Sequence, residues 1–497
     1  MSQFVLHLAA ALLPLLAVTS AAAPDQVETT QIDTINIDTN HTNTNQSLCQ
    51  QISLALPHRV SRPGSSNYTS MLSEYYTEDE RDRYLHDAGV RNGNSKAPQF
   101  AFRSGGHSFF AGAANINGGV TVDLRSLDSF KLSADQKTAS LGGGSRWSHN
   151  VYPNLEPYNL AVAGGRLQGV GVGEFVTGGG LNFLGRRDGF ACDNIYGYEV
   201  VLASGKVVYA SATSNRDLWL ALKGGSNNFG IITRFDLKTF PLHDMREGYL
   251  QFNVTPTVLE DHAVAWANFM KLEKFDELAL WEGNLAWTAG SWTILDFLNY
   301  AAPDPAPAAY AEVMAMPGQV ANTLVVTNVT TIVEEYSQTD SSHVNRAVQM
   351  NYSFKAGDAS IFSQIIQSFT DAVEPLKKIN GLVWTMLIKP FPVTNGTNSF
   401  GLEPNVKDRV LVNIAGAFND VEDHDTVLTT LEALFKKHVQ IVTDAGLFVS
   451  YTYLNYAGLN QEPIKSYGNM ATLQAVSKKY DPRGIFQKAV PGPWKLF

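Results

Sequence analysis

The chain has very few cysteines, and its histidines are scattered. Only Cys49 and Cys192 occur among 497 residues, which excludes a zinc finger or a cysteine-rich scaffold. In an oxidising compartment the two would be able to pair across a long loop. The alternative is two unpaired, buried thiols, and the sequence favours neither. The eleven histidines show no HExxH or other compact ligand spacing, so we expect no metal site.

Positive charge is also scarce. Lysine and arginine together number 37 against 47 acidic residues, a net charge of -10, so the chain lacks the basic field that binds nucleic acid. After the N-terminal segment no apolar run is long enough to span a membrane. We therefore expect neither nucleic acid nor a membrane as a partner. The 44% hydrophobic content and the length predict two or three globular domains.

The N-terminal residues predict export. An apolar run from Phe4 to Val18 precedes the small residues Ala21 to Ala23, which is typical of a signal peptide over residues 1–23. A buried N-terminal helix is the alternative. Residues 24–47 are polar and rich in Thr and Asn, and predict a flexible leader. Seven Asn-x-Ser/Thr sequons support a secreted protein with N-glycans: Asn40, Asn45, Asn67, Asn253, Asn328, Asn351 and Asn395.

The texture of the sequence changes near residue 240. From about 98 to 240, short apolar strands alternate with glycine turns, and "YEVVLASGKVVYAS" predicts a hairpin that turns at "ASGK". From 241 to 450, amphipathic helical patterns alternate with strands. This mixture predicts an α+β domain whose antiparallel sheet is covered on one face.

Glycines gather in four places within 130 residues: Gly105-Gly106, 142–147, 164–180 and 223–230. Successive backbone N–H groups in such turns form anion-binding nests, and glycine lets the backbone approach a diphosphate. Hairpin turns and bulges are the alternative interpretation of any single cluster. None of the four matches a dinucleotide fingerprint or a P-loop. Together, however, they favour phosphate binding.

A histidine follows one of these clusters, in "RSGGHS". Alone, such a residue is more often a structural hydrogen-bonding group, and Arg103 would simply end a strand. In combination, His107 offers a nucleophilic imidazole beside a diphosphate nest. That arrangement is suited to covalent attachment of a dinucleotide cofactor.

Several ordered motifs carry a family resemblance. "RSGGHS" is followed by "VTVDLRSL", "AGGRLQGVGVGEFVTGGG", "GFACDNI", "LWLALKGGSNNFGIITRFDLKTFP", "YLNY" and "KKYDPRGIFQ". In this order they resemble fungal FAD-linked oxidoreductases of the berberine bridge enzyme-like family, which have the vanillyl-alcohol-oxidase (PCMH-type) FAD domain. The resemblance implies an FAD-binding domain of two subdomains over 48–240. It also implies a substrate domain over 241–450 and a segment over 451–497 that returns to the FAD domain.

The resemblance implies FAD joined to His107 through an 8α-histidyl bond. Bicovalent members carry a cysteine where this chain has Leu167, so a single link is expected. The implied cofactor-binding residues are Arg103, Ser104, Gly105, Gly106, His107, Ser108, Gly171, Val172, Gly173, Thr177, Gly178, Gly179, Gly180, Asp193, Asn194 and Ile231, with Ile232 beside the adenine. About thirty family residues have no counterpart near 76–98, including the usual disulfide partner of Cys49. Either the first FAD subdomain is shortened or the gene model skips an exon.

The same resemblance implies Tyr453, Asn455 and Tyr456 as catalytic residues. A tyrosine that acts as a base needs a lowered pKa, which a nearby Lys or Arg would provide, and Lys389 is one candidate. Ordinary packing of both tyrosines is the alternative. Glu282 is a rival base, and Trp281, Trp287 and Trp384 are candidates for the pocket wall. The expected reaction is oxidation of an alcohol, amine or sugar carbon of a small molecule, with dioxygen as electron acceptor. A flavoprotein scaffold without redox turnover and a degenerate protein without flavin are the alternatives.

Overall fold

The computed structural model of the chain describes residues 48–56, 59–78, 80, 99–116, 119–339 and 346–497. The predicted signal peptide and leader lie outside the described residues. So does most of the segment 76–98, where the family pattern is shortened. Within the described ranges, no helix is long and apolar enough to cross a membrane.

The first half of the described chain contains two sheets. Strands β1 and β2 pair in parallel, and a six-stranded antiparallel sheet has the order β3-β4-β8-β6-β7 with β5 on β8. Strands β6 and β7 form the predicted hairpin. The strand bounds are β1 Phe100–Arg103, β2 Val120–Asp123, β3 Phe130–Leu132, β4 Thr138–Gly142, β5 Leu160–Val162, β6 Ile195–Val201, β7 Val207–Ser211 and β8 Ile231–Pro241. Short helices connect them: α2 Leu48–Ala55, α3 Ser66–Leu72, α5 Tyr152–Leu155, α6 Val172–Thr177, α7 Gly185–Asp188 and α8 Arg216–Leu222.

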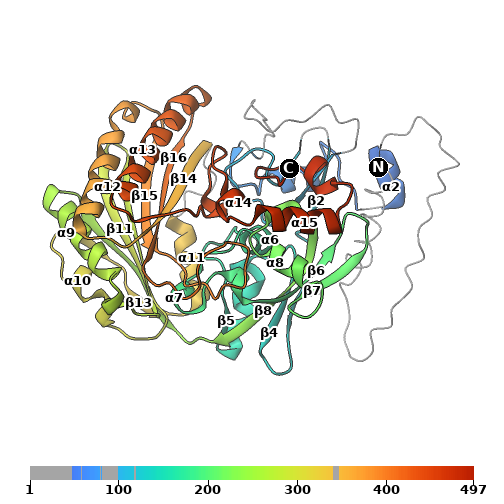
Figure 1. Cartoon of the computed structure of the whole chain (residues 1–497), viewed down its shortest axis with the longest axis horizontal. Helices are drawn as coiled ribbons and strands as arrows, with labels where there is room; N and C mark the ends of the chain where they lie inside the picture. The colour runs from blue at the N-terminus through green and yellow to red at the C-terminus, as the bar shows by residue number, and fades with distance from the viewer. Residues whose placement is uncertain (1–47, 57–58, 79, 81–98, 117–118, 340–345) are drawn as a thin grey trace.

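Within the described residues, the second half is built on one nine-stranded sheet. Its strand order is β12-β9-β11-β10-β15-β16-β14-β17, and β13 pairs with β9. Its strands are β9 Met245–Asn253, β10 Ala279–Thr288, β11 Ser291–Tyr300, β12 Gln319–Asn322, β13 Val325–Thr327, β14 Arg346–Lys355, β15 Val383–Pro390, β16 Arg409–Phe418 and β17 Phe448–Val449. Its helices are α9 Pro256–Phe269, α10 Ala311–Met314, α11 Val329–Thr339, α12 Ala359–Ala372 and α13 His424–Asp444. Helices α9, α12 and α13 lie along the outer face of the sheet (Figure 1). This is the predicted α+β arrangement with one covered face.

The covering helices follow from their sequences. Asp358 caps α12 by accepting the Ser360 N–H at 2.9 Å. The apolar residues of α12 recur at three- and four-residue intervals, so one stripe is buried: Ile361, Phe362, Ile365, Ile366 and Phe369. The Phe369 ring stacks on Trp384 of β15, with centroids 5.8 Å apart.

The tryptophans of the sheet correct one prediction. Trp281 packs against Phe269 of α9, and Trp384 packs against α12, so both face the helices. Trp287 contacts Trp292 and the same helix-side core. Side chains on a strand alternate between faces, and these three point away from the first half of the chain. They form core and do not line a substrate pocket.

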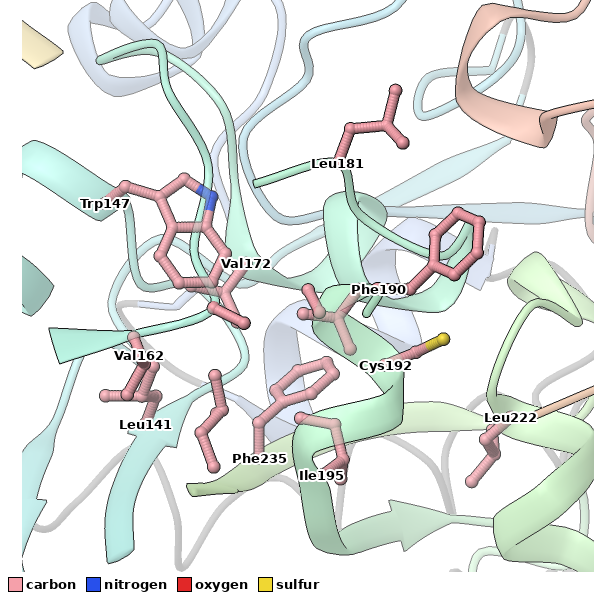
Figure 2. Packing of buried hydrophobic residues seen from close by; sticks show 14 of the residues in the cluster. Leu141, Trp147, Val162, Val172, Leu181, Phe190, Cys192, Ile195, Leu222 and Phe235 are labelled. Carbon is pink, nitrogen blue, oxygen red and sulfur yellow. The ribbon is translucent and has the colours of Figure 1, made fainter. Parts of the chain in front are cut away.

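Two further predictions are settled by burial. Cys192 is a free thiol that lies among the apolar side chains of the first half's core, so the unpaired alternative holds for it (Figure 2). Asn351 on β14 is fully buried, and its amide accepts the Tyr453 N–H at 2.8 Å and donates to the Tyr453 carbonyl at 2.9 Å. A glycan on Asn351 is incompatible with this packing, so this sequon does not mark a glycosylation site in the folded chain.

The C-terminal residues return to the first half, mostly as helix: α14 Pro463–Ser466, α15 Met470–Tyr480 and α16 Ile485–Lys488. Helix α15 lies beside α8 (Figure 1), where Lys479 pairs with Asp217 at 2.6 Å. Strand β17 lies just before this segment. Residues 451–456 pass between the two halves, because their backbone pairs with Asn351 of the sheet while Tyr453 contacts the first half.

Candidate functional site

A cavity of about 400 Å³ runs between the two halves of the chain. Its lining includes residues of "RSGGHS", of strand β8, and of strands β14 and β16 of the nine-stranded sheet. Such a volume is within the usual range for a small-molecule or cofactor site. Its wall combines glycine loops with aromatic and polar side chains: Ser104, Gly106, His107, Ser108, Arg166, Leu167, Gly171, Gly173, Glu174, Thr177, Ile232, Gln349, Asn413, Tyr453, Asn455, Tyr456 and Trp494.

The loop after β1 forms an anion-binding nest. The backbone N–H groups of Ser104, Gly105 and Gly106 all donate to the Glu174 carboxylate, at 2.8, 2.9 and 3.1 Å. Consecutive amides that converge on one anion are the donor set that holds a phosphate group. The residues present therefore fit a diphosphate, with a carboxylate of the chain itself in the position of the anion. Sequence reasoning predicted the nest but not Glu174.

Glycine is required at two points of this nest. A Cβ on Gly105 would lie 2.3 Å from the Gly171 backbone nitrogen, so the two loops touch through their main chains. Gly106 has a φ of +73°, a left-handed conformation that other residues rarely adopt. A Cβ there would also meet the Tyr75 ring at 2.9 Å. The glycines therefore allow both the turn and the close approach.

His107 lies in the cavity wall directly after the nest. Its ring packs against Tyr76, with centroids 3.9 Å apart, and the Tyr76 N–H donates to the Gly106 carbonyl at 3.1 Å. The imidazole is thus fixed beside the cavity by its neighbours.

A cluster of charges supports the nest from behind. Arg103 is fully buried, donates to the Met71 carbonyl at 2.7 Å and pairs with Glu74. Glu74 also pairs with Arg125 and with Arg146, the latter at 2.6 Å. Burial alone would raise the pKa of Glu74, but the three guanidinium groups outweigh it and lower that pKa. Arg103 therefore stabilises the loop through these buried contacts and is not part of the cavity wall.

The predicted cofactor residues divide into two groups. Ser104, Gly106, His107, Ser108, Gly171, Gly173 and Thr177 line the cavity, as does Ile232. The remaining ones lie behind the wall: Arg103, Gly105, Val172, Gly178, Gly179, Gly180, Asp193, Asn194 and Ile231. Gly105 still contributes its N–H to the nest.

Asp193 and Asn194 stabilise a turn. The Asp193 carboxylate accepts the Phe190 N–H at 3.1 Å and the Asn398 amide at 2.6 Å, and burial raises its pKa. The Asn194 amide donates to the carbonyls of Asp188 and Phe190. Neither residue lines the cavity, and both hold this turn in place.

Tyr453, Asn455 and Tyr456 also line the cavity. Tyr453 is 1% exposed, and its oxygen accepts the Leu181 N–H at 3.2 Å and the Asn455 amide at 3.1 Å. Burial is the main cause that raises the pKa of Tyr453, and the nearby Tyr456 is the second cause. The Tyr453 phenol therefore keeps its proton. Tyr453 is therefore poorly placed to act as a base.

Tyr456 has a cationic neighbour that the sequence did not reveal. Its oxygen accepts a hydrogen bond from Arg166 at 3.2 Å. Arg166 also pairs with Glu282, and Glu282 pairs in turn with Lys389, both of them almost fully buried. Burial and the Arg166 charge lower the pKa of Lys389 well below its usual value. Lys389 is thus two contacts away from the tyrosine, and Glu282 binds two cations instead of facing substrate.

Comparison with known proteins decides the family. A model of the "FAD binding domain" matches residues 90–211. The chain is 34% identical over 420 residues to the FAD-dependent monooxygenase tpcD of Cochliobolus heterostrophus, covering 80% of each protein. It is 32% identical to drtC of Aspergillus calidoustus, an FAD-dependent monooxygenase, covering 80% of this chain and 77% of that one. The chain belongs to the berberine bridge enzyme-like family. It is therefore an FAD-linked oxidoreductase.

Solved structures agree on the fold of this FAD-linked oxidoreductase. The 6-hydroxy-D-nicotine oxidase of Arthrobacter nicotinovorans superposes with a TM-score of 0.71 at 19% identity, over 86% of this chain and 96% of that one. The xylooligosaccharide oxidase of Myceliophthora thermophila superposes with a TM-score of 0.66 at 21% identity, over 87% and 96%. Among the described residues, no group of three or more His, Cys, Asp or Glu side chains is placed to hold a metal ion.

Proposed function

We propose that this FAD-linked oxidoreductase removes a hydride and a proton from an alcohol, amine or sugar carbon of a small molecule, with FAD joined to His107 alone. The observation that carries the proposal is one continuous cavity. Its wall includes the nest loop with His107 and the Tyr456–Arg166 pair. When bound, FAD supplies the hydride acceptor. The residues of the cavity wall would supply attachment, orientation and proton transfer.

Binding of FAD would depend on the nest and on His107. The Ser104, Gly105 and Gly106 amides would hold the diphosphate, as they hold a carboxylate in this structure. His107 directly follows them, so its imidazole would reach the ring system while the diphosphate fixes the position of the cofactor. Leu167 lines the wall where bicovalent relatives carry cysteine, which supports a single covalent bond.

Proton transfer would depend on Tyr456 and Arg166. For this role Tyr456 would have to be in its phenolate form, whose oxygen would take the proton of the substrate hydroxyl or amine as hydride leaves the adjacent carbon. A charged N–H donor strengthens a hydrogen bond to a negatively charged oxygen, so Arg166 would favour the phenolate form of Tyr456 that takes the proton. Glu282 holds Arg166 in place, and Lys389 holds Glu282. Tyr453 and Asn455 would position the segment that carries Tyr456.

The test is Tyr456→Phe, with Tyr451→Phe as the matched control. Tyr451 lies in the same segment, but it is outside the cavity wall and its hydroxyl has no hydrogen-bond partner among the described residues. Loss of general base catalysis should reduce the rate of anaerobic flavin reduction by about 10²–10⁴-fold in Tyr456→Phe, with unchanged flavin content. Tyr451→Phe should keep the parent rate. Equal rates in Tyr456→Phe and the parent would reject Tyr456 as the base.

The substrate class needs a screen. Aryl alcohols, amines and oligosaccharides would be tested for flavin bleaching and for hydrogen peroxide, because dioxygen is the proposed electron acceptor. Relatives at 32–34% identity are named FAD-dependent monooxygenases, so product mass must be measured too. Peroxide in proportion to substrate supports an oxidase. A product that gains an oxygen atom would instead assign this chain the activity that those names state.

We also propose that the protein enters the secretory pathway. The support is the signal-like segment 1–23 and three sequons whose asparagines are exposed, Asn67, Asn253 and Asn395. Expression of the full chain in a fungal host should give secreted protein whose mass falls on treatment with an endoglycosidase. Protein retained in the cytosol at its unmodified mass would contradict this proposal.

A further inference from the structure

The nest that fits a diphosphate already holds an anion from the chain. Both oxygens of Glu174 accept hydrogen bonds, Oε1 from the Ser104 and Gly106 amides and Oε2 from Gly105. Glu174 belongs to the first turn of α6, and the Gly173 N–H of that turn donates back to the Ser104 side chain at 3.2 Å. The carboxylate and the loop therefore make a compact, fully hydrogen-bonded contact.

This contact is incompatible with simultaneous binding of a phosphate group. Each N–H has one proton to donate, so three amides that point at Glu174 cannot also point at a second anion in the same place. A carboxylate left beside a diphosphate would also repel it, and that repulsion is strong where water is partly excluded. Glu174 is only partly buried, so rotation of its side chain is able to empty the nest without unfolding α6.

We propose that Glu174 is a built-in competitor for the diphosphate of FAD. Its carboxylate occupies the nest before the cofactor arrives, leaves the nest when FAD binds, and thereby sets the affinity for the cofactor. This inference rests on the proposed assignment of the nest to the diphosphate. It identifies a residue that weakens cofactor binding, whereas the residues around it strengthen it.

A purely structural role for Glu174 makes the opposite prediction. If the carboxylate only held the loop against α6, its removal would disorder the nest and weaken binding of every phosphate ligand. If it competes, its removal strengthens binding although the ligand-free protein becomes less stable. The sign of the change in affinity therefore separates the two roles, and the melting temperature of the ligand-free protein reports the lost hydrogen bonds independently.

The experiment uses the full chain with His107→Ala, so that FAD binds reversibly. Glu174→Gln and Glu174→Ala are added to this background, and ADP and FAD are titrated by calorimetry. Glu422→Gln is the matched control, because it removes the same charge from an exposed position in the second half. We expect both Glu174 variants to bind ADP and FAD about tenfold or more tightly than the background, a difference of about 1.4 kcal/mol per tenfold. Glu422→Gln should leave both affinities unchanged.

The outcomes separate this inference from the proposed function. Tighter ADP binding by the Glu174 variants supports the competitor even if no variant binds FAD, a result that would reject the flavin function alone. Unchanged or weaker ADP and FAD binding by Glu174→Gln overturns the competitor, while FAD binding by the background protein leaves the flavin function intact. Failure of every variant to bind either ligand overturns both.

Discussion

A methyl group on Gly105 should separate the two loops that form the nest. The added Cβ would lie 2.3 Å from the Gly171 nitrogen and 2.8 Å from the Gly169 carbonyl oxygen. These are backbone atoms and no flexible side chain can move aside, so the loops must move apart by roughly 1 Å in a tightly packed region. Overpacking of this kind costs about 1–3 kcal/mol. We expect Gly105→Ala to lower the melting temperature by roughly 5–10 °C, for a folding unit of about 200 residues.

Gly169→Ala is the matched control for this prediction. It lies in the loop that Gly105 touches, but a Cβ on Gly169 has no atom within 4 Å. Differential scanning fluorimetry and the ratio of flavin to protein absorbance would be measured on both variants. Gly105→Ala should lose stability and most of its flavin, whereas Gly169→Ala should match the parent. Equal melting temperatures and flavin contents in the two variants would refute the argument that main-chain contact forms the nest.

Three further predictions concern buried polar groups in the second half. Burial and the neighbouring Glu335 raise the pKa of Glu247 from 4.5 to about 8. Glu247→Gln should therefore increase the free energy of unfolding at pH 7 by about 1–3 kcal/mol, with no increase below pH 4.5, as measured by urea unfolding. The Asp296 carboxylate accepts a hydrogen bond from His262 Nε2 at 2.9 Å, and both side chains are fully buried. Asp296→Ala should therefore lower the free energy of unfolding by about 3–5 kcal/mol. Burial alone would lower the pKa of His262, but Asp296 outweighs burial and raises it. The stability lost in Asp296→Ala should therefore be largest in acid and should shrink as the pH rises through the raised pKa of His262. Peptide mapping should find no glycan at Asn351, and a glycosylated Asn351 would contradict its packing.

Local patterns in the sequence predicted much of this architecture. The hairpin of β6 and β7 followed from two apolar runs around "ASGK", and the covered sheet followed from helices that alternate with strands. The nest followed from glycines beside His107, because consecutive amides in a turn are a local property. Tyr453, Asn455 and Tyr456, which the family resemblance indicated, line the cavity, and their catalytic role stays a prediction.

Contacts between distant segments were not predictable in this way. Alternation along β10 shows that Trp281 and Glu282 point to opposite faces, but it does not show which face the helices cover. The cation beside Tyr456 comes from Arg166, 290 residues earlier, whereas Lys389 seemed a natural partner from its motif. Glu174 lies within a glycine-rich motif, and only the folded loop shows that its carboxylate occupies the nest.

The central claim, a single covalent flavin on His107, is tested most directly by a denaturing gel viewed for flavin fluorescence after acid treatment. The parent protein, His107→Ala and, as control, His149→Ala at an exposed position would be compared at equal load. The account predicts a fluorescent band in the parent and in His149→Ala that is absent from His107→Ala. A fluorescent band that persists in His107→Ala, or a parent protein without flavin, would contradict it.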